Sequence, residues 1–416
     1  MNLLYLSLFI TLVHTSVQHV SHDHHPTHED KNEHNGKTHT KALEDICQAH
    51  LQFSVSLFRH IASSQEKSPK NIFFSPFSIS TAFSMLSLGA KSETHKQILE
   101  GLSLNETRVK EEEIHEAFEQ LILALNKPKS DLQVNIGNAV FVQENLNLLK
   151  TFADQVEHYY RAEILSTDFS NANDAEKKIN DYVKKKTEGK IEELVKDLDD
   201  GTKLVLLNYI FFKGEWENKF NPSSTRVSNF FVDGNTTVKV QMMSRIGSYK
   251  IYQDDQLPCL VLQLPYKNNA SMLVVIPEMG KIREVEEALS VDTIKRWKKS
   301  AHLRFTQVHM PKFSISSSVN LKEVLSDMGI KDAFSNKADF SGISQDARLV
   351  VTKAVHKAVL DVHEKGTEAA GATAIEIMPM SILQSHKVNR PFILLICSEE
   401  TDSIFFMGRV TDPTAK

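Results

Sequence analysis

Apolar residues recur at helical spacing through much of the first half of the chain. Between Leu43 and Ile61 they return every three or four positions, which predicts a helix. Ser75 and Pro76 mark the start of a second predicted helix over Phe77 to Leu88, because proline is favoured in the first turn. Two further segments with helical spacing are Glu111–Leu125 and Lys177–Lys184.

Short runs of β-branched, aliphatic and aromatic residues predict strands elsewhere in the chain. These runs are Val134–Val142, Leu204–Phe212, Cys259–Leu264, Met272–Ile276 and Leu303–Met310. Phe392–Cys397 and Ser403–Val410 are predicted to form a final hairpin. Because helices precede most strands and do not alternate with them, the pattern predicts an α+β fold.

One segment, GTEAAGATAIEIMPMS from Gly366 to Ser381, fits neither pattern well. Its alanines and glycines are weak strand formers, and two glycines weaken a helix. In an extended chain one face would carry Glu368, Ala370, Ala372, Ala374, Glu376 and Met378, and the other would carry Thr367, Ala369, Gly371, Thr373, Ile375 and Ile377. Both charges therefore share one face. Two charges would share a face by chance half the time. The segment suits either a mobile loop or an inserted strand.

Composition restricts the class of protein. The chain has 416 residues, of which 24% are charged and 41% hydrophobic, as in an ordinary globular protein. No linker interrupts residues 45–413, so a single domain is expected over residues 43–416. A net charge of −5 predicts no nucleic-acid partner and argues against binding to an anionic membrane.

The N-terminal region predicts secretion. The apolar run from Leu3 to Val13 is too short to span a bilayer and is typical of a signal peptide over residues 1–16. Residues 17–42 lack apolar periodicity and are expected to be disordered. This tail is rich in histidine, at His22, His24, His25, His28 and His34. Such a tract can hold Zn or Cu. A solvated tail is favoured because no fixed geometry surrounds it, so no metal site is predicted.

Three predicted glycosylation motifs agree with secretion, whereas the cysteine content says little about location. Asn-X-Ser/Thr motifs occur at Asn105, Asn235 and Asn269, although such motifs also arise by chance. The three cysteines, Cys47, Cys259 and Cys397, are too few and scattered for a disulfide framework. Cys259 and Cys397 lie in apolar runs and are predicted to be buried thiols.

The sequence predicts no enzyme. It has no GxSxG, HExxH or CxxC motif, and Gly36-Lys37-Thr38 lacks the rest of a phosphate-binding loop. No catalytic residue and no cofactor are therefore predicted.

Four segments resemble the serpin family in order and spacing. They are NIFFSPFSISTAFSMLSLGAKSETHKQILEGL (71–102), LNYIFFKGEWENKF (207–220), VTKAVHKAVLDVHEKG (351–366) and VNRPFILLICSEETDSIFFMGRVTDP (388–413). The resemblance covers roughly residues 45–413 and is closest to the alpha-1-antitrypsin-like plasma inhibitors, including the Met380–Ser381 pair. It implies the serpin fold: three β-sheets, eight or nine helices and an exposed reactive-centre loop at about residues 364–385.

The resemblance implies a secreted inhibitor that acts as a suicide substrate. A protease would attack Met380–Ser381, and the cut loop would then insert into the large sheet and trap the acyl-enzyme. Because methionine is long and apolar, we expect elastase-like or chymotrypsin-like serine proteases with an apolar specificity pocket, and we expect the inhibitor to be monomeric. The alternatives are a non-inhibitory relative acting as a carrier or storage protein, and an ER collagen chaperone. Small hinge residues argue against the first, and the C-terminus, TDPTAK, argues against the second. The acidic helix Glu111–Leu125 makes heparin activation unexpected.

The resemblance also assigns roles to individual residues. The loop hinge comprises Glu364, Gly366, Thr367, Glu368, Ala369, Ala370, Gly371, Ala372 and Thr373. A polar cluster under the opening sheet, the shutter, comprises Ser75, Ser78, Asn208 and His356. Trp216 matches the breach where insertion begins, and Lys312 with Glu364 matches an ion pair at the loop base. The serines are alternatively plain helix caps, and the histidine an ordinary core residue.

Overall fold

The computed structural model describes residues 28–65, 70–125, 132–199, 201–345, 348–367 and 383–415. By its internal contacts the chain divides into Met1–Thr40 and Lys41–Lys416, and every described strand lies in the second unit. The predicted signal peptide lies outside the described residues. None of the helices in the described part of the chain combines the length and apolar character needed to cross a membrane.

Nine α-helices lie within the described residues, in agreement with the predicted eight or nine. They are α1 (His28–Ser63), α2 (Pro76–Ser87), α3 (Ser92–Gly101), α4 (Glu111–Leu125), α5 (Lys150–Tyr160), α6 (Ala172–Lys186), α7 (Ile282–Glu287), α8 (Val291–Ser300) and α9 (Leu321–Asp327). The four helices predicted from spacing are confirmed as parts of α1, α2, α4 and α6.

Helix α1 starts well before the predicted helix. It begins at His28 instead of near Leu43, so residues 28–42 of the tail are helical in the structure. Extending an existing helix fixes one residue for each new hydrogen bond, which is far easier than nucleating one. No proline interrupts the chain between His28 and Ser63, so helix propagation meets no steric block. Residues 17–27 lie outside the described residues.

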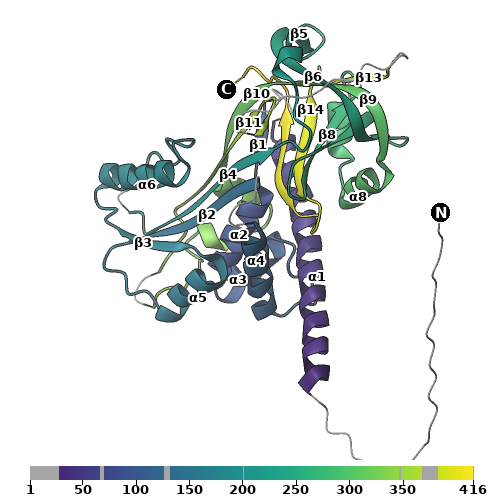
Figure 1. Ribbon diagram of the computed structural model, residues 1–416. Helices are drawn as coiled ribbons and strands as arrows, with labels where there is room; N and C mark the ends of the chain where they lie inside the picture. The colour runs from purple at the N-terminus through teal and green to yellow at the C-terminus, as the bar shows by residue number, and fades with distance from the viewer. Residues whose placement is uncertain are drawn as a thin grey trace, which may run out of the picture. The chain divides into compact units, whose positions relative to one another are not determined.

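The described strands form two hydrogen-bonded sheets (Figure 1). The nine-stranded sheet contains β1 (Ile72–Phe74), β5 (Arg226–Phe231), β6 (Thr237–Gln253), β7 (Cys259–Pro265), β8 (Ala270–Pro277), β9 (His302–Pro311), β13 (Ser385–Lys387), β14 (Phe392–Ser398) and β15 (Ile404–Val410). The six-stranded sheet contains β2 (Leu132–Gln143), β3 (Glu163–Thr167), β4 (Leu204–Glu215), β10 (Phe313–Asn320), β11 (Lys353–Val362) and β12 (Gly366–Thr367).

The long strand β6 explains why two sheets appear where three were expected. Its 17 residues pair with β5 and β9 over most of their length, and its last four pair with β7. One strand thus joins two groups of strands into a continuous ladder. The predicted third sheet corresponds to the β5, β9 and β13 part of the nine-stranded sheet.

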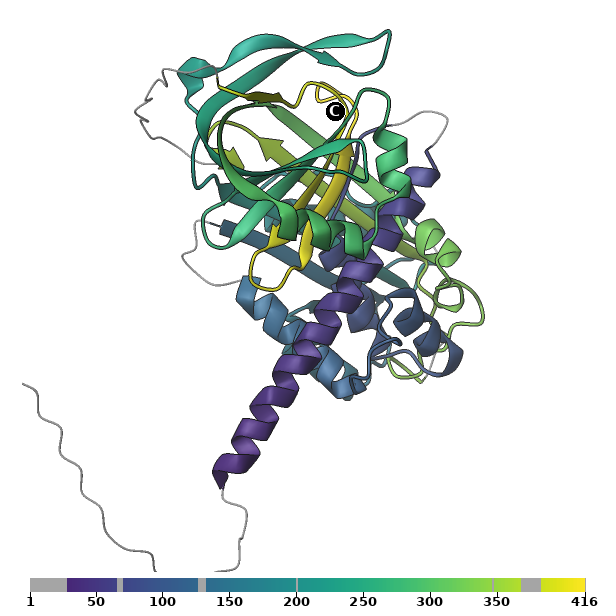
Figure 2. The ribbon, with the colours of Figure 1, turned by 90° about the vertical axis from the view of Figure 1, so that its right-hand side faces the viewer.

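The C-terminal hairpin β14–β15 lies inside the nine-stranded sheet, between β8 and β1 (yellow in Figures 1 and 2). All residues of both strands are buried, which agrees with their continuous apolar sequence. Cys259 and Cys397 are buried free thiols, as predicted, and Cys47 is a half-buried free thiol.

Three apolar clusters surround the six-stranded sheet. One contains Leu206 of β4 and the buried residues of α1, α2 and α4, and a second fills the space between the two sheets. A third joins α6 to the outer face of β4, through residues such as Val183 and Leu207. Every residue of α2 is buried, so this helix passes through the interior beneath the six-stranded sheet.

Candidate functional site

The centre of the six-stranded sheet is a parallel pair of strands. β4 and β11 pair in register from Val205↔Lys353 to Phe211↔Val359, and we call this pairing the β4–β11 seam. The other pairings of β4 in the described part of the chain are antiparallel. Because parallel pairs are slightly less stable per residue than antiparallel ones, the seam is the least stable ladder of β4 per residue.

A buried polar network lies under the middle of the seam. Asn208 and His356 are register partners, and both are fully buried. His356 Nδ1 lies 2.6 Å from Asn208 Oδ1. The backbone N–H of Ser75 donates to His356 Nε2 at 2.9 Å, and Asn208 Nδ2 donates to the Ser78 carbonyl at 2.8 Å. Asn208 Nδ2 also donates to Asn138 Oδ1 at 2.7 Å. We call these five residues the seam network.

The seam network fixes the tautomer of its histidine. Nε2 accepts from a backbone N–H, so the ring proton lies on Nδ1 and is donated to Asn208. Burial lowers the pKa of His356 to about 3. The network is therefore neutral at physiological pH, and it joins β11, β4 and β2 to the start of α2.

The two predicted serines have different parts in the network. The Ser75 hydroxyl caps α2 by accepting from the Ser78 N–H at 3.1 Å, while its own N–H binds His356. The capping interpretation and the cluster interpretation therefore both hold for Ser75. Ser78 contributes its carbonyl, and its buried hydroxyl makes no hydrogen bond within the described residues.

At the upper end of the seam, aromatic rings and an ion pair hold the base of the loop. Trp216 stacks on Tyr266 with ring centroids 4.3 Å apart, and its Nε1 donates to the His363 carbonyl at 2.9 Å. Glu364 Oε2 lies 3.2 Å from Lys312 Nζ, and Oε1 accepts from the Thr225 hydroxyl at 2.9 Å. The structure thus brings the predicted pair into contact. We call this group the loop base.

The charge of Glu364 is set by two opposing effects. Burial raises its pKa, but hydrogen bonds from its own backbone, Thr225 and Lys312 outweigh this and leave the pKa below its ordinary value. Glu364 is thus ionised at physiological pH. Lys312 is half exposed, so this ion pair lies close to solvent.

Gly366 is required by the geometry of the loop base. Its φ of +133° is unfavourable for other residues, and a Cβ there would lie 2.1 Å from the carbonyl oxygen of Gly214. Gly366 and Thr367 form β12, which pairs antiparallel with Glu215 and Gly214 of β4. This short strand begins where the β4–β11 seam ends.

Several predicted site residues lie outside the described residues. These are the hinge residues Glu368, Ala369, Ala370, Gly371, Ala372 and Thr373, and the predicted reactive bond Met380–Ser381. For Thr367 only the backbone is described. Their roles remain predictions.

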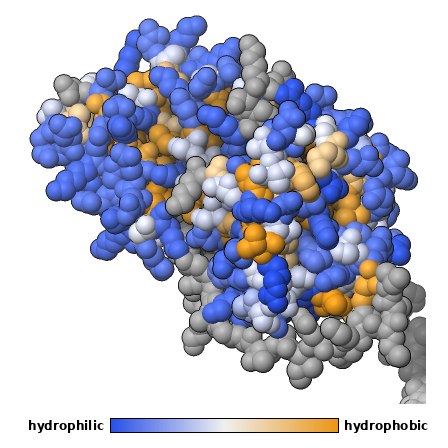
Figure 3. Space-filling model, turned by 90° about the horizontal axis from the view of Figure 1, so that it is seen from above, coloured by the Kyte–Doolittle hydropathy of each residue, from blue (hydrophilic) through white to orange (hydrophobic). Residues whose placement is uncertain are grey.

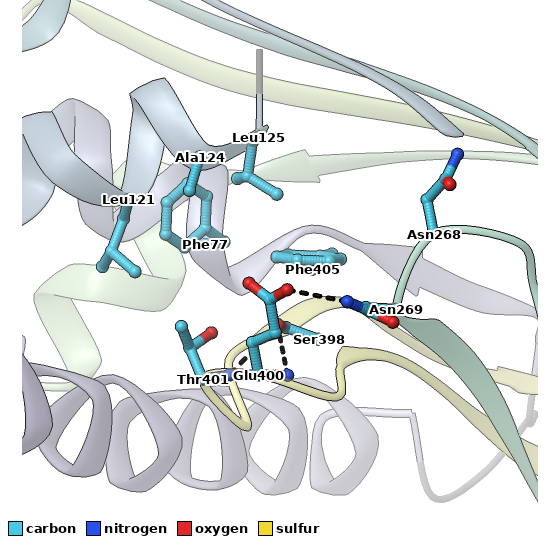
Figure 4. Close-up of a pocket in the computed structure, with 10 residues that line it drawn as sticks. All are labelled: Phe77, Leu121, Ala124, Leu125, Asn268, Asn269, Ser398, Glu400, Thr401 and Phe405. Atoms are coloured by element: carbon cyan, nitrogen blue, oxygen red, sulfur yellow. Dashed lines mark hydrogen bonds between the residues drawn. The ribbon is translucent and has the colours of Figure 1, made fainter. Parts of the chain in front are cut away.

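The three predicted glycosylation sites, Asn105, Asn235 and Asn269, are all exposed. Asn269 lies at a cavity of about 360 Å³ between α2, α4 and the β14–β15 turn (Figure 4). Its Nδ2 donates to Glu400 Oε1 at 2.7 Å, while Phe77 and Phe405 contribute apolar rings to the lining. Exposure at all three positions is compatible with glycan attachment.

Asn138 and Thr225 are site residues that sequence reasoning missed. Asn138 is a polar residue inside the predicted strand Val134–Val142, and it faces Asn208 across the β2–β4 ladder. A polar residue within an apolar strand was a usable signal for a buried network. Thr225 lies in an exposed-looking polar stretch and gave no such signal.

Comparison with known proteins gave consistent matches. The family model "Serpin (serine protease inhibitor)" matches residues 48–413. Alpha-1-antiproteinase of Rattus norvegicus is 48% identical over 362 residues, covering 87% of this chain and 88% of that protein. Serine protease inhibitor A6 of Xenopus laevis is 45% identical over 435 aligned positions, covering 99% of each.

Two solved structures are also similar. Human thyroxine-binding globulin in complex with thyroxine has a TM-score of 0.86 and 41% identity, over 90% of this chain and 100% of that one. Human glycosylated kallistatin has a TM-score of 0.83 and 40% identity, again over 90% and 100%.

Proposed function

This chain belongs to the serpin family of serine protease inhibitors, and we propose that it is a secreted, glycosylated inhibitor that traps an elastase-like or chymotrypsin-like protease as an acyl-enzyme. In this proposal the protease serine attacks the Met380 carbonyl and releases the Ser381 amine. The loop then inserts between β4 and β11 before water can hydrolyse the acyl bond. The protein itself supplies no catalytic group.

The observation that carries the proposal is the position of β12 at the upper end of the β4–β11 seam. β12 already pairs antiparallel with β4, and its Gly366 bridges back to His363 after β11. A chain that continued from Thr367 in the same direction, antiparallel to β4, would enter between β4 and β11. It would replace one parallel ladder with two antiparallel ones, which favours insertion.

The register of β12 also supports the predicted assignment of loop residues to the inward face of an inserted strand. Gly366 pairs with Glu215 and Thr367 with Gly214, so an extended continuation would put Ala369 opposite Phe212 and Thr373 opposite Asn208. Phe212 and Asn208 face the inner side of the sheet, toward α2 and the second sheet. The inserted face would therefore be Thr367, Ala369, Gly371 and Thr373, which are small and uncharged.

Insertion on this scale would move the protease across the molecule. From Thr367 to Met380 an inserted strand would extend about 45 Å, at roughly 3.3 Å per residue. Met380 would then lie beyond Leu204, at the end of β4 opposite the loop base. An acylated protease tethered there would be pressed against the far end of the inhibitor.

Trapping is tested by mixing the protein with neutrophil elastase and with chymotrypsin and looking for an SDS-stable complex. We expect a complex with wild type. We expect cleavage without a complex for Thr367→Arg, because a buried arginine on the inserted face resists insertion. A normal complex from Thr367→Arg would contradict the assignment of Thr367 to the inward face. If wild type forms no complex with any serine protease, the proposed inhibitory function is wrong.

Specificity is tested at the predicted bait residue. Met380→Arg should gain inhibition of trypsin and thrombin, because arginine pairs with the carboxylate in their specificity pocket. Elastase inhibition should fall at the same time. Unchanged elastase inhibition without a gain against trypsin would show that the bait lies elsewhere, with Met378 as the next candidate.

The runner-up function is that of a carrier. Human thyroxine-binding globulin, solved with thyroxine bound, has the same fold and 41% identity. Isothermal titration with thyroxine separates the two proposals. Saturable thyroxine binding with no SDS-stable protease complex would favour the carrier function.

A further inference from the structure

Two large apolar side chains are exposed side by side on one strand. Leu303 and Phe305 of β9 are 70% and 57% exposed. Residues two apart on a strand point to the same face, so the two side chains form one surface feature, which we call the apolar pair. A single exposed apolar residue is ordinary, but adjacent ones of this size indicate an interaction surface.

The residues beside the apolar pair are exposed, so the pair does not pack into the core. On the same face, its register partners on β6 are Lys250 and Ser248, which are both exposed. The opposite face of β6 does pack into the core, through Tyr249 and Ile251. The molecular face that carries β5, β6, β9 and β13 is mostly hydrophilic, with apolar side chains reaching the surface in a few places (Figure 3).

The apolar pair lies beside the C-terminal side of the predicted reactive loop. The Gln384 carbonyl accepts a hydrogen bond from the Gln307 N–H at 3.0 Å and another from the Thr306 hydroxyl. Gln384 is thus fixed next to Phe305 along β9. Whatever path the chain takes, covalent geometry places Ser381 within about 11 Å of Gln384, at no more than ~3.6 Å per residue.

A protease bound at Met380–Ser381 would reach this surface. A typical protein interface buries about 800 Å² on each partner, equivalent to a disc of about 16 Å radius. That radius exceeds the reach of the chain from Ser381 to Gln384. The protease rim on the C-terminal side of the reactive bond would therefore face β9.

We propose that the apolar pair is a second contact site for the target protease, outside the reactive loop, and that it selects among proteases with similar specificity pockets. This inference rests on the proposed inhibitory function. Lys250 is exposed opposite Leu303, and Glu217 and Glu399 line the same cavity as Leu303, so charges of both signs border the pair. The complementary protease surface is accordingly an apolar patch with a polar rim.

The test replaces the apolar pair without altering charge. In the double variant Leu303→Thr with Phe305→Thr, threonine keeps the strand preference and removes the apolar bulk. For a protease that forms an SDS-stable complex with wild type, we expect the second-order rate constant of inhibition to fall about ten-fold, as for loss of an interface anchor. The stoichiometry of inhibition should not change, because the acyl-enzyme partitions between trapping and hydrolysis only after docking is complete.

Two controls separate docking from a loss of stability. Leu123 of α4 is also exposed, at 43%. Helix α4 lies away from β9 (Figure 1). Leu123→Thr should leave the rate unchanged. The conservative pair Leu303→Ile with Phe305→Tyr should restore most of the rate, and all variants should keep the wild-type melting temperature.

The outcomes distinguish this inference from the proposed function. If wild type forms the complex and the threonine variant inhibits every trapped protease at the wild-type rate, the contact site is wrong and the inhibitory function stands. If wild type self-associates and only the threonine variant is monomeric, with unchanged rates, the surface binds a second copy and the inference is overturned. If wild type traps no serine protease, both proposals fail.

Discussion

The seam network and the loop base hold the same two strands by different chemistry. The seam network is neutral and fully buried, and its histidine is held in one tautomer by hydrogen bonds from two sides. The loop base uses an ion pair with a half-exposed lysine and a stacked tryptophan. The network resists opening by the desolvation cost of every group it would leave unpaired, whereas the ion pair is close to water and screened by salt.

The difference indicates an order of opening. Groups near solvent can exchange a protein partner for water at little cost, but buried groups cannot. The upper end of the β4–β11 seam should therefore separate first, and the seam network should hold until an inserting chain offers new partners. Substitutions that equalise the two regions, or that separate them further, test this order of opening.

The largest effect should come from breaking the seam network. Asn208→Leu keeps much of the volume but leaves the His356 Nδ1–H and Asn138 Oδ1 unpaired in the interior. At about 1–3 kcal/mol for each orphaned group, the first urea unfolding transition should lose about 4 kcal/mol. Asn173→Leu, on the exposed face of α6, serves as the matched control and should change little. Equal losses in both variants would contradict the importance of the network.

Next in size is a change to the backbone of the loop base. Gly366→Ala combines an unfavourable φ with a Cβ that meets the Gly214 carbonyl oxygen, so we expect a loss of about 3 kcal/mol. Gly280 also has a positive φ, of +77°, but no atom of the described residues lies within 4 Å of its Cβ position. Gly280→Ala should therefore cost only about 1 kcal/mol. Melting temperatures of the two variants provide the comparison, and similar values would mean that β12 is free to shift.

Acidification should separate the two regions by their pH windows. Burial lowers the pKa of His356 to about 3, from an ordinary 6.5, so the unfolded chain binds this proton and the folded protein does not. Stability from this group is complete above pH 6.5 and declines as pH falls toward 3, by about 2 kcal/mol at pH 5. Burial also lowers the pKa values of His50 and His115 to about 4, so they add to the slope in the same direction.

The loop base should respond in a different window. The lowered pKa of Glu364 gives stability that is present above its ordinary value of 4.5 and is lost only as pH falls further. Urea unfolding between pH 6.5 and 5 should therefore report the histidines, with Lys312→Met showing the wild-type slope. If stability falls less steeply between pH 6.5 and 5 in Lys312→Met than in wild type, the loop base titrates in the same pH range as the histidines. That result would contradict the predicted difference between the two regions.

The smallest effect should come from the ion pair. Lys312→Met leaves the buried Glu364 carboxylate with hydrogen bonds from the Thr225 hydroxyl and its own backbone, and the lost partner is half exposed, so we expect a loss of about 0.5–1 kcal/mol that shrinks in high salt. Lys150→Met breaks the more exposed pair with Asp154 and should cost less still. Denaturation at low and high salt provides the measurement. A large, salt-independent loss for Lys312→Met would indicate that the pair is effectively buried.

Sequence patterns predicted the elements whose apolar residues are continuous or strictly periodic. The hairpin β14–β15 and helices α2 and α4 have such patterns, and they were found close to their true limits. β6 was missed because polar residues and Gly247 interrupt its sequence, TVKVQMMSRIGSYKIYQ. β11 alternates regularly between buried and half-buried residues, but lysines on its outer face hid the strand from a search for apolar runs.

The site was accessible to sequence reasoning only through resemblance. Asn208 and His356 are 148 positions apart, and no local pattern indicates that they are hydrogen-bonded. The tautomer, the link from Asn208 to Asn138 and the close approach of Gly366 to Gly214 depend on tertiary contacts. The role of Glu364 likewise depends on Lys312 and Thr225, which come from other parts of the chain.

The position of β14 and β15 inside the nine-stranded sheet has a consequence for biosynthesis. β14 and β15 are synthesised after the other described strands, yet they lie between β1 and β8, which are made much earlier. Until then β1 and β8 each lack a neighbour on this side, and unpaired strand edges are templates for pairing with another chain. A nascent chain shortened by a premature stop before Phe392 would keep both edges open, so truncation near the C-terminus should lead to aggregation or retention by chaperones even though the loop and the seam strands are complete.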